Sequence, residues 1–413
     1  MNEQSLRDGC ERRLPETLDF LRAMVGINSF TAHAGGVCRV GECIAEKFDG
    51  LGFVPEFVPP ENPEHGSHLV LRRAPVEGAP TIALISHLDT VFPAEEERAN
   101  AFAWRVEGDR IYGPGTNDIK GGTAAIHLLL VVLREVAPEV FDGANWVVLC
   151  NAAEEADSYD FGRVCRRVLP ADARACLIFE ADGGKRDHPV LVEARKGRAT
   201  FRVEVEGRGA HAGGAHALGA NAIVALSWLV GRLAAVTDYE AGLTVNVGRI
   251  EGGTVTNRVP HFAAAALEMR AFSREVYEDA KKRILALSGA QAGCRVTVRL
   301  LDETPPWPRN AGTDGLMALW VAAGAELGMP VESMTRGGLS DGNVLWEDFP
   351  TLDGLGPCGE NSHCSVRSPD GEEDQEWVDA ASFVPKTVLN ALAIGRLLGG
   401  APQGMPARGA AGT

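Results

Sequence analysis

The spacing of apolar residues predicts two kinds of organisation in this chain, and the change falls near residue 198. Up to about residue 190, short apolar runs typical of buried strands are separated by longer stretches with helical periodicity. We expect helices over residues 15–25, 37–51 and 119–136, and strands over residues 68–72, 81–86, 145–151 and 175–180. Strands that alternate with helices in this way predict an α/β domain.

Residues 198–302 follow a different order of elements, β-α-β-β-α-β, which predicts a ferredoxin-like α+β domain inserted into the first one. Its expected strands are 199–206, 243–250, 261–272 and 295–301, and its expected helices are 218–235 and 273–288. After the proline-rich "ETPPWP" at 303–308, a helix, a strand and a helix complete the larger domain. We therefore divide the chain into residues 1–197 and 303–398, an insert at 198–302, and a Gly/Ala/Pro-rich tail at 399–413 that we expect to be disordered.

Composition narrows the classes of partner. Of the 413 residues, 45% are hydrophobic, which is ample for two cores. The balance of 40 basic against 56 acidic residues gives a formal charge of −16, which argues against nucleic acid and anionic membranes as partners. No segment approaches the ~20 uninterrupted apolar residues of a membrane helix.

The number and spacing of the cysteines and the composition of the amino terminus indicate the cellular compartment of the protein. The nine cysteines are odd in number and form no Cys-x-x-Cys pair, which favours reduced thiols over a disulfide framework. Residues 1–13 are polar and charged and lack the apolar core of a signal peptide. We expect a cytoplasmic protein.

Polar side chains follow several of the predicted strands. The apolar run 81–85 leads into "SHLDTVFP", which carries His87 and Asp89 just where residues beyond a strand face the ligand crevice of an α/β sheet. Alone, such a His-x-Asp pair could be an ordinary turn. The further candidates are Asp118 in "YGPGTNDIKGG", Glu154 and Glu155 after "WVVLCN", Glu180 in "ACLIFEAD" and His363 in "GPCGENSH".

These residues have the chemistry of a metal site. Asp118 by itself could be a helix cap, but adjacent carboxylates such as Glu154 and Glu155 beside a buried strand cost free energy unless a cation or solvent compensates them. Histidines and carboxylates that converge on one side of one sheet suit zinc, and two ions if one carboxylate bridges them.

In their order and spacing, the motifs "SHLDTVFP", "YGPGTNDIKGG", the Glu-Glu pair, "FEAD", "GRGAHAG" and "GPCGENSH" resemble the dinuclear zinc amidohydrolases and metallopeptidases. This family includes glutamate carboxypeptidase, acetylornithine deacetylase, succinyl-diaminopimelate desuccinylase and the aminoacylases. The resemblance spans about residues 15–398. It implies a zinc-peptidase-like catalytic domain, an inserted dimerisation and lid domain, a homodimer, and two Zn²⁺ ions per chain that Co²⁺ or Mn²⁺ could replace.

The resemblance also implies roles for single residues. Asp118 matches the carboxylate that bridges both metals. The further ligands are His87 and Glu180 for one ion, and Glu155 and His363 for the other. The next motif residue, Asp182, lies close enough to Glu180 to be an alternative ligand.

Two acids have roles that do not require a metal bond. Asp89 matches an acid that hydrogen-bonds the ligand histidine and fixes its tautomer. Glu154 matches the general base, which takes a proton from the metal-activated water and delivers it to the leaving amine. If the backbone is extended at Glu154 and Glu155, their side chains point in different directions, so one can bind metal while the other faces the substrate.

The insert supplies candidates for substrate binding. In the family, the position of His211 reaches across a dimer to polarise the scissile carbonyl, and the positions of Asn257 and Arg270 hold the substrate's carboxylate. Arg336 in "TRGGLSDGN" is a further candidate, although such a loop arginine is often only solvated. His216 stands where the family usually has proline, and its role is open.

Arg270 lies on an alternating strand. Ala266, Glu268, Arg270 and Phe272 share one face, and the other face is apolar. The apolar face suits packing against the insert's helices, which leaves Arg270 on the face that can meet a ligand. The alternative is a surface arginine paired with Glu268.

The favoured function is a zinc-dependent hydrolase that cleaves an amide bond next to a free carboxylate, in a peptide or an N-acyl amino acid. Whether it is a carboxypeptidase or a deacylase stays open, as do the preferred acyl group, the amino acid and the native metal. The alternative is a catalytically silent, metal-holding relative that acts as a binding or regulatory protein. Retention of Glu154 beside the ligands argues against it, because a merely structural site needs no base.

Overall fold

The computed structural model describes residues 1–156 and 159–399, which form two compact units. The larger unit comprises residues 1–193, 309–335 and the chain from 340 onward, and the insert comprises residues 194–308 with 336–339. We describe each unit by itself. The expected disordered tail lies outside the described residues from position 400 onward.

A six-stranded sheet with the order β1-β2-β6-β3-β7-β15 forms the centre of the larger unit. These strands are, in the same order, Val54–Val58, His68–Arg72, Asn145–Asn151, Thr81–His87, Ala175–Ile178 and Thr351–Leu352. Strands β6, β3, β7 and β15 run parallel, whereas β2 pairs antiparallel with both of its neighbours, β1 and β6. The carboxyl ends of β3, β6 and β7 therefore meet at one edge of the sheet.

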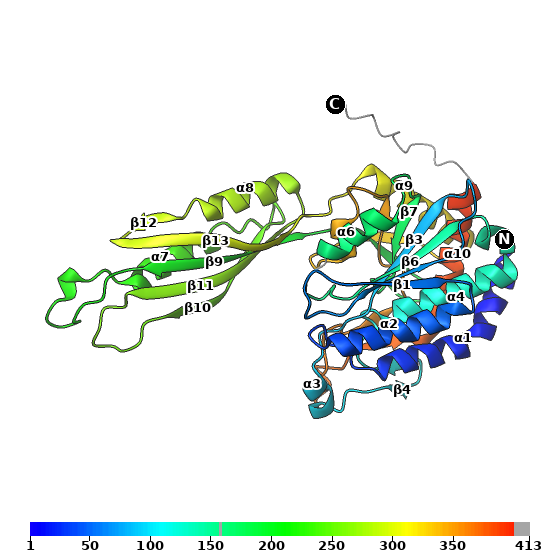
Figure 1. Cartoon of the computed structure of the whole chain (residues 1–413), viewed down its shortest axis with the longest axis horizontal. Coiled ribbons are helices and arrows are strands. Elements are labelled where there is room, and N and C mark those ends of the chain that lie inside the picture. Colours follow the sequence, from blue (N-terminus) through cyan, green and yellow to red (C-terminus); the bar gives the residue numbers. More distant parts are fainter. Residues whose placement is uncertain (157–158, 400–413) are drawn as a thin grey trace, which may run out of the picture. The chain divides into compact units, whose positions relative to one another are not determined.

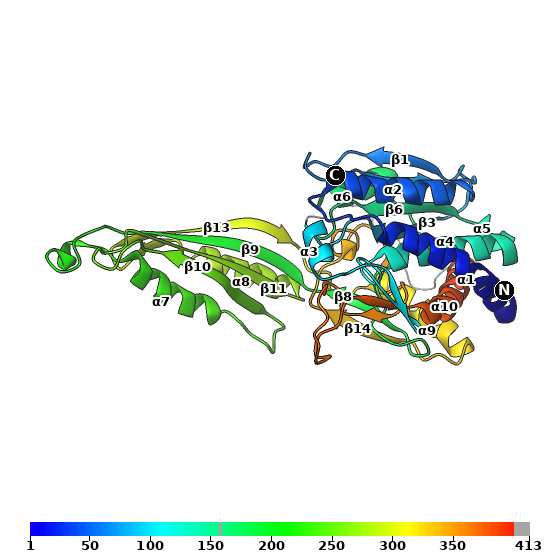
Figure 2. The ribbon, with the colours of Figure 1, turned by 90° about the horizontal axis from the view of Figure 1, so that it is seen from below.

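Helices cover both faces of this sheet (Figures 1 and 2). On β3, Ile82 and Leu84 belong to the core shared with helices α1, α2, α4, α9 and α10, while Ala83 and Ile85 belong to the core under α6. These helices are α1 (Glu3–Val25), α2 (Ala34–Asp49), α4 (Lys120–Val136), α6 (Tyr159–Val168), α9 (Ala311–Glu326) and α10 (Phe383–Gly399). Shorter elements are α3 (Ala94–Ala99), α5 (Pro138–Phe141), β4 (Arg105–Glu107), β5 (Arg110–Tyr112), β8 (Val190–Arg195), β14 (Glu332–Arg336), β16 (Gly359–Glu360) and β17 (Trp377–Asp379).

The insert is an antiparallel sheet with the order β10-β11-β9-β13-β12. Its strands are β9 (Gly197–Glu206), β10 (Thr244–Gly252), β11 (Phe262–Ala271), β12 (Gly289–Gln291) and β13 (Cys294–Thr304), and its helices are α7 (Ala222–Ala234) and α8 (Arg274–Leu285). Leu267, Met269 and Ala271 are buried with both helices, whereas Glu268 and Arg270 are partly exposed. The alternation predicted for this strand is therefore present.

The fold class, an α/β domain with an inserted ferredoxin-like domain, is confirmed. Some predicted boundaries are wrong. Helix α1 begins at Glu3, because the segment before Pro15 packs Leu6 and Cys10 into the core. Helix α7 begins at Ala222, where Asn221 accepts hydrogen bonds from the first turn. The short strand β12 has too few residues for a recognisable pattern.

Two further expectations concern thiols and membranes. The nine cysteines, all of which lie within the described residues, are free. Among the helices of residues 1–156 and 159–399, none is long and apolar enough to cross a bilayer.

Candidate metal centre

Parallel strands of the larger unit deliver the candidate residues to one edge of the sheet. His87 is the last residue of β3, Glu154 and Glu155 follow β6, and Glu180 follows β7. Asp118 precedes α4 at the end of a glycine-containing loop, and the peptide bond between Asp118 and Ile119 is cis. Residues that are distant in sequence therefore meet because their strands are parallel neighbours.

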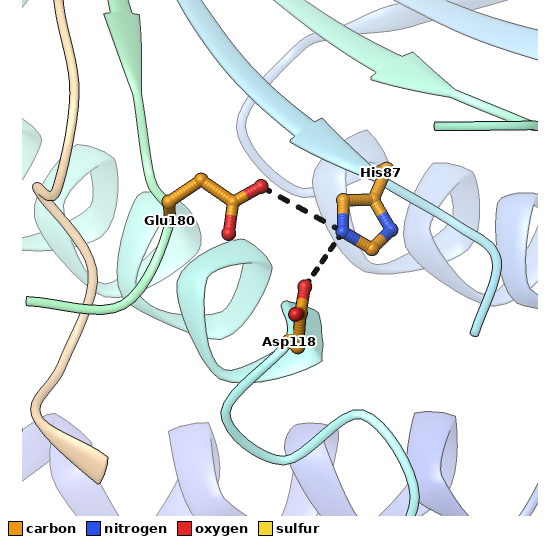
Figure 3. A group of neighbouring side chains, drawn as sticks. All are labelled: His87, Asp118 and Glu180. Atoms are coloured by element: carbon orange, nitrogen blue, oxygen red, sulfur yellow. Dashed lines mark hydrogen bonds and ion pairs between the residues drawn. The ribbon is translucent and has the colours of Figure 1, made fainter. Parts of the chain in front are cut away.

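The first group of possible ligands is His87, Asp118 and Glu180 (Figure 3). The Nε2 atom of His87 lies 3.0 Å from Oδ1 of Asp118 and 3.7 Å from Oε1 of Glu180. One ligand atom from each residue lies within 4.8 Å of the others. All three side chains can therefore reach one ion.

The second group is Asp118, Glu155 and His363. The Nε2 atom of His363 lies 3.2 Å from Oδ2 of Asp118 and 3.2 Å from Oε2 of Glu155. Asp118 thus presents Oδ1 to the first group and Oδ2 to the second. This is the arrangement that a bridging carboxylate requires.

Burial and neighbouring charges shift the pKa values of this cluster. Burial raises the pKa of Glu154 well above its usual range and also raises that of Glu155, to which the Asp118 charge adds. Hydrogen bonding to Asp118 and Glu155 raises the pKa of His363 to about 11. Against the effect of burial, hydrogen bonds from His363 and His87 lower the pKa of Asp118.

The donor set fits two divalent ions. Each group offers one imidazole nitrogen and carboxylate oxygens, which zinc accepts together and which also suit cobalt or manganese. The side chain of His363 is 52% exposed, so the second group reaches solvent through this histidine. His363 adopts a left-handed backbone with φ 67°, a conformation that is uncommon outside glycine and gathers at functional sites.

Asp89 contacts the candidate ligand His87 and also the backbone of Glu154 and Glu155. Nδ1 of His87 lies 3.0 Å from the backbone carbonyl oxygen of Asp89 and 3.4 Å from its carboxylate. The carboxylate accepts hydrogen bonds from the backbone N–H groups of Glu154 at 3.1 Å and Glu155 at 3.2 Å. The expected histidine contact is therefore made mainly by the main chain, and the Asp89 carboxylate fixes the Glu-Glu segment.

The expectation that the backbone is extended at Glu154 and Glu155 is wrong. Residues 154–156 form a turn, in which the amide of Ala156 donates to the carbonyl of Ala153 at 3.2 Å. The two consecutive amides converge on one carboxylate, which an extended segment would not allow. Even so, Glu155 pairs with His363, whereas the Glu154 side chain makes no hydrogen bond within residues 1–156 and 159–399.

Sequence reasoning missed residues that hold this segment. The hydroxyl of Thr31 donates a hydrogen bond to Oδ2 of Asp89 at 2.6 Å. His68 is fully buried, accepts the Ala152 amide on Nδ1 at 3.1 Å, and contacts Asp160 through Nε2 at 3.1 Å. A histidine in the apolar run 68–71 was the one available signal.

Asp182 does not compete with Glu180. Its Oδ2 atom lies 2.5 Å from the Nζ of Lys386, and both side chains are buried. Its Oδ1 accepts the amides of Gly184 at 2.6 Å and Val190 at 2.8 Å. The structure therefore assigns Asp182 to a structural ion pair.

The remaining candidates lie in the insert. His211 is exposed, and its Nδ1 accepts the amides of Gly213 and Gly214. Asn257 is also exposed, and its backbone carbonyl accepts a hydrogen bond from the Ala212 amide at 3.0 Å. His216 lines a cavity of about 530 Å³ beside these loops.

Arg270 forms the ion pair that was the alternative to substrate binding. Its Nε lies 3.0 Å from Oε1 of Glu268, and its Nη1 donates to the Gly337 carbonyl at 2.9 Å. Arg336 lies beside this carbonyl in sequence and is partly exposed. Asn257 precedes β11 and Arg270 ends it, so roughly 25 Å of strand separates them. One chain therefore cannot bring both residues to one carboxylate.

Comparison with known proteins agrees with this geometry. Residues 194–293 match the peptidase dimerisation domain of the M20 peptidases. The chain is 28% identical over 384 residues to carboxypeptidase G2 of Pseudomonas sp. strain RS-16, covering 91% of this chain and 88% of that protein. It is 26% identical over 353 residues to succinyl-diaminopimelate desuccinylase of Novosphingobium aromaticivorans, covering 82% and 90%.

Among solved structures, the M20 family metallo-carboxypeptidase Sso-CP2 of Sulfolobus solfataricus has the same fold, with a TM-score of 0.72 at 16% identity over 93% of this chain and 99% of that one. Together with the ligand geometry, these matches define a metal-dependent hydrolase of the metallopeptidase and amidohydrolase class. More narrowly, the chain is similar to M20 peptidases along most of its length, and the predicted family resemblance is confirmed.

Proposed function

We propose that this protein is a two-metal amide hydrolase for substrates with a free carboxylate next to the scissile bond, either peptides or N-acyl amino acids. The observation that carries the proposal is the division of the Asp118 oxygens between two histidine-containing groups, with Glu154 partly buried close to both. The relatives named carboxypeptidase and desuccinylase support this substrate class.

The chain's own residues account for the steps. His87 and Glu180 would hold one zinc ion, Glu155 and His363 the other, and Asp118 both. When bound, the ions polarise the substrate carbonyl and lower the pKa of the attacking water. Glu154 takes the proton from that water and returns it to the leaving amine, while Asp89 keeps the base in place through the backbone of residues 154 and 155.

Substituting the base and the shared ligand separates chemistry from metal binding. Glu154→Gln should leave about two zinc ions per chain but lower turnover by several orders of magnitude. Asp118→Ala should deplete the metal, measured by elemental analysis after dialysis. Near-normal turnover of Glu154→Gln would show that the base is assigned wrongly. Two bound ions without turnover on any N-acyl amino acid or dipeptide would favour the silent, regulatory alternative.

We further infer a homodimer in which each active site borrows His211 and Asn257 from the neighbouring chain. The separation of Asn257 and Arg270 along β11 supports this, because a small substrate touches both only if they come from different chains. On α7, Val224 and Trp228 are 59% and 52% exposed, which suits a pairing surface.

Mixing inactive chains tests the shared site. A heterodimer of Glu154→Gln and His211→Ala chains should contain one intact site and recover activity. A confirmed heterodimer without recovery would refute the exchange of His211, whatever the metal content.

A further inference from the structure

Glu376 is a buried carboxylate that lies beside the metal centre but belongs to neither ligand group. Its Oε1 atom accepts the backbone amides of Asn117 at 2.9 Å and Asp118 at 3.1 Å. One oxygen therefore fixes two consecutive peptide units of the loop that presents the shared ligand.

The main chain of Glu376 is hydrogen-bonded to the loop that carries His363. Its amide donates to the carbonyl of Cys364, the residue after His363, at 2.8 Å. The side chain of Asn117 donates to Oγ of Ser362 at 2.8 Å, on the other side of His363. The loops that present Asp118 and His363, two of the three residues of the second ligand group, are thus held through Glu376 and its immediate neighbours.

Placing a carboxylate at position 376 costs free energy. The Glu376 side chain is fully buried, and burial disfavours the charged form of a carboxylate. Its second oxygen, Oε2, has no hydrogen-bond partner within residues 1–156 and 159–399. An apolar side chain would fill the same space without this cost, so the acceptor at Oε1 is the property that the site uses.

We propose that Glu376 is a positioning residue that sets the affinity of the metal position formed by Asp118, Glu155 and His363, through the acceptor Oε1. The proposal rests on the two-metal function. It adds that the carboxylate charge of Glu376 is dispensable, whereas the place of its acceptor atom is not.

Two conservative substitutions separate charge from position. Glu376→Gln keeps an oxygen acceptor at the same reach and removes the charge. Glu376→Asp keeps the charge but withdraws the acceptor by about 1.5 Å, one C–C bond. Glu193 is a matched control in the same unit, since it is buried, pairs with Arg309 at 3.3 Å and likewise leaves one oxygen unpartnered. Its Gln and Asp variants are made alongside.

Metal affinity is measured on the zinc-loaded proteins by competition with a chromophoric chelator, together with kcat and KM. We expect the Gln variant to match the parent within about threefold, and the Asp variant to bind one of its two ions at least about tenfold more weakly, with lower kcat and little change in KM. Parent-like affinity in Glu376→Asp, or equal damage in Glu376→Gln, would overturn the assignment. So would weaker binding of both ions in the Glu193 variants. If the parent itself bound no metal, the two-metal function would fail first.

Discussion

Acidification should weaken this fold through His127, a histidine that α4 places in an apolar environment. His127 is 5% exposed, and its ring centroid lies 5.6 Å from that of Phe20 on α1 and 5.2 Å from that of Phe48 on α2. Burial, followed by the positive charge of Lys47, lowers its pKa to about 4. Arg13, Glu16 and Arg134 are the other charged groups that act on it.

The sign and size of the effect follow from the two protonation equilibria. The unfolded chain binds the proton near pH 6.5 and the folded chain only near pH 4, so the stability that neutral His127 contributes is lost as the pH falls through this window. The loss amounts to about 2 kcal/mol at pH 5 and about 3 kcal/mol at pH 4.

Urea unfolding of the metal-free parent and His127→Phe at pH 7.5 and pH 5 measures this loss. Phenylalanine retains the ring contacts and cannot be protonated. Other titrating groups act equally in both proteins, so the difference between their unfolding free energies should change by about 2 kcal/mol in favour of the variant at pH 5. A difference that is the same at both pH values would refute the argument.

Three further predictions concern the active site and assembly. Thr31→Val should retain both metals and lose about ten- to a hundredfold in kcat, because Asp89 loses a donor, and Thr31→Ser should restore it; unchanged kcat in the valine variant would contradict this. Trp228→Glu should give monomers in sedimentation experiments, while Val106→Glu, an exposed position on the larger unit, should not. Arg270→Ala should abolish a preference of about thirty- to a thousandfold for an α-carboxylate substrate over its α-amide, and equal discrimination by both proteins would leave Arg270 as the partner of Glu268.

The sequence predicted the residues that the structure brings together in the two possible ligand groups, because each follows a recognisable apolar strand or glycine-containing loop. His87, Asp118 and Glu155 could be found in this way. The residues that position them could not. Thr31 and Glu376 come from segments remote from their partners, and Glu376 acts on backbone amides, which have no identity in a sequence.

Two points that the sequence left open have a different physical origin. The roles of Glu180 and Asp182 could not be separated because the deciding partner, Lys386, lies about two hundred residues away and is found only by folding. The distance between Asn257 and Arg270 within one chain could not be judged either, because the two residues are only 13 positions apart in sequence. Because each residue of an extended strand adds about 3.4 Å, the distance between them is longer than a small substrate.

The continuous segment of the insert, residues 194–308, begins and ends on neighbouring stretches of chain. Arg198 of β9 pairs with Thr304 of β13, and the main chains of Arg195 and Trp307 exchange hydrogen bonds. A domain whose two ends are neighbours can be added at one surface loop of an existing fold without opening its core. In evolutionary terms, residues 194–308 form a continuous module that recombination can exchange while the strands that present His87 and Glu180 keep their sequence.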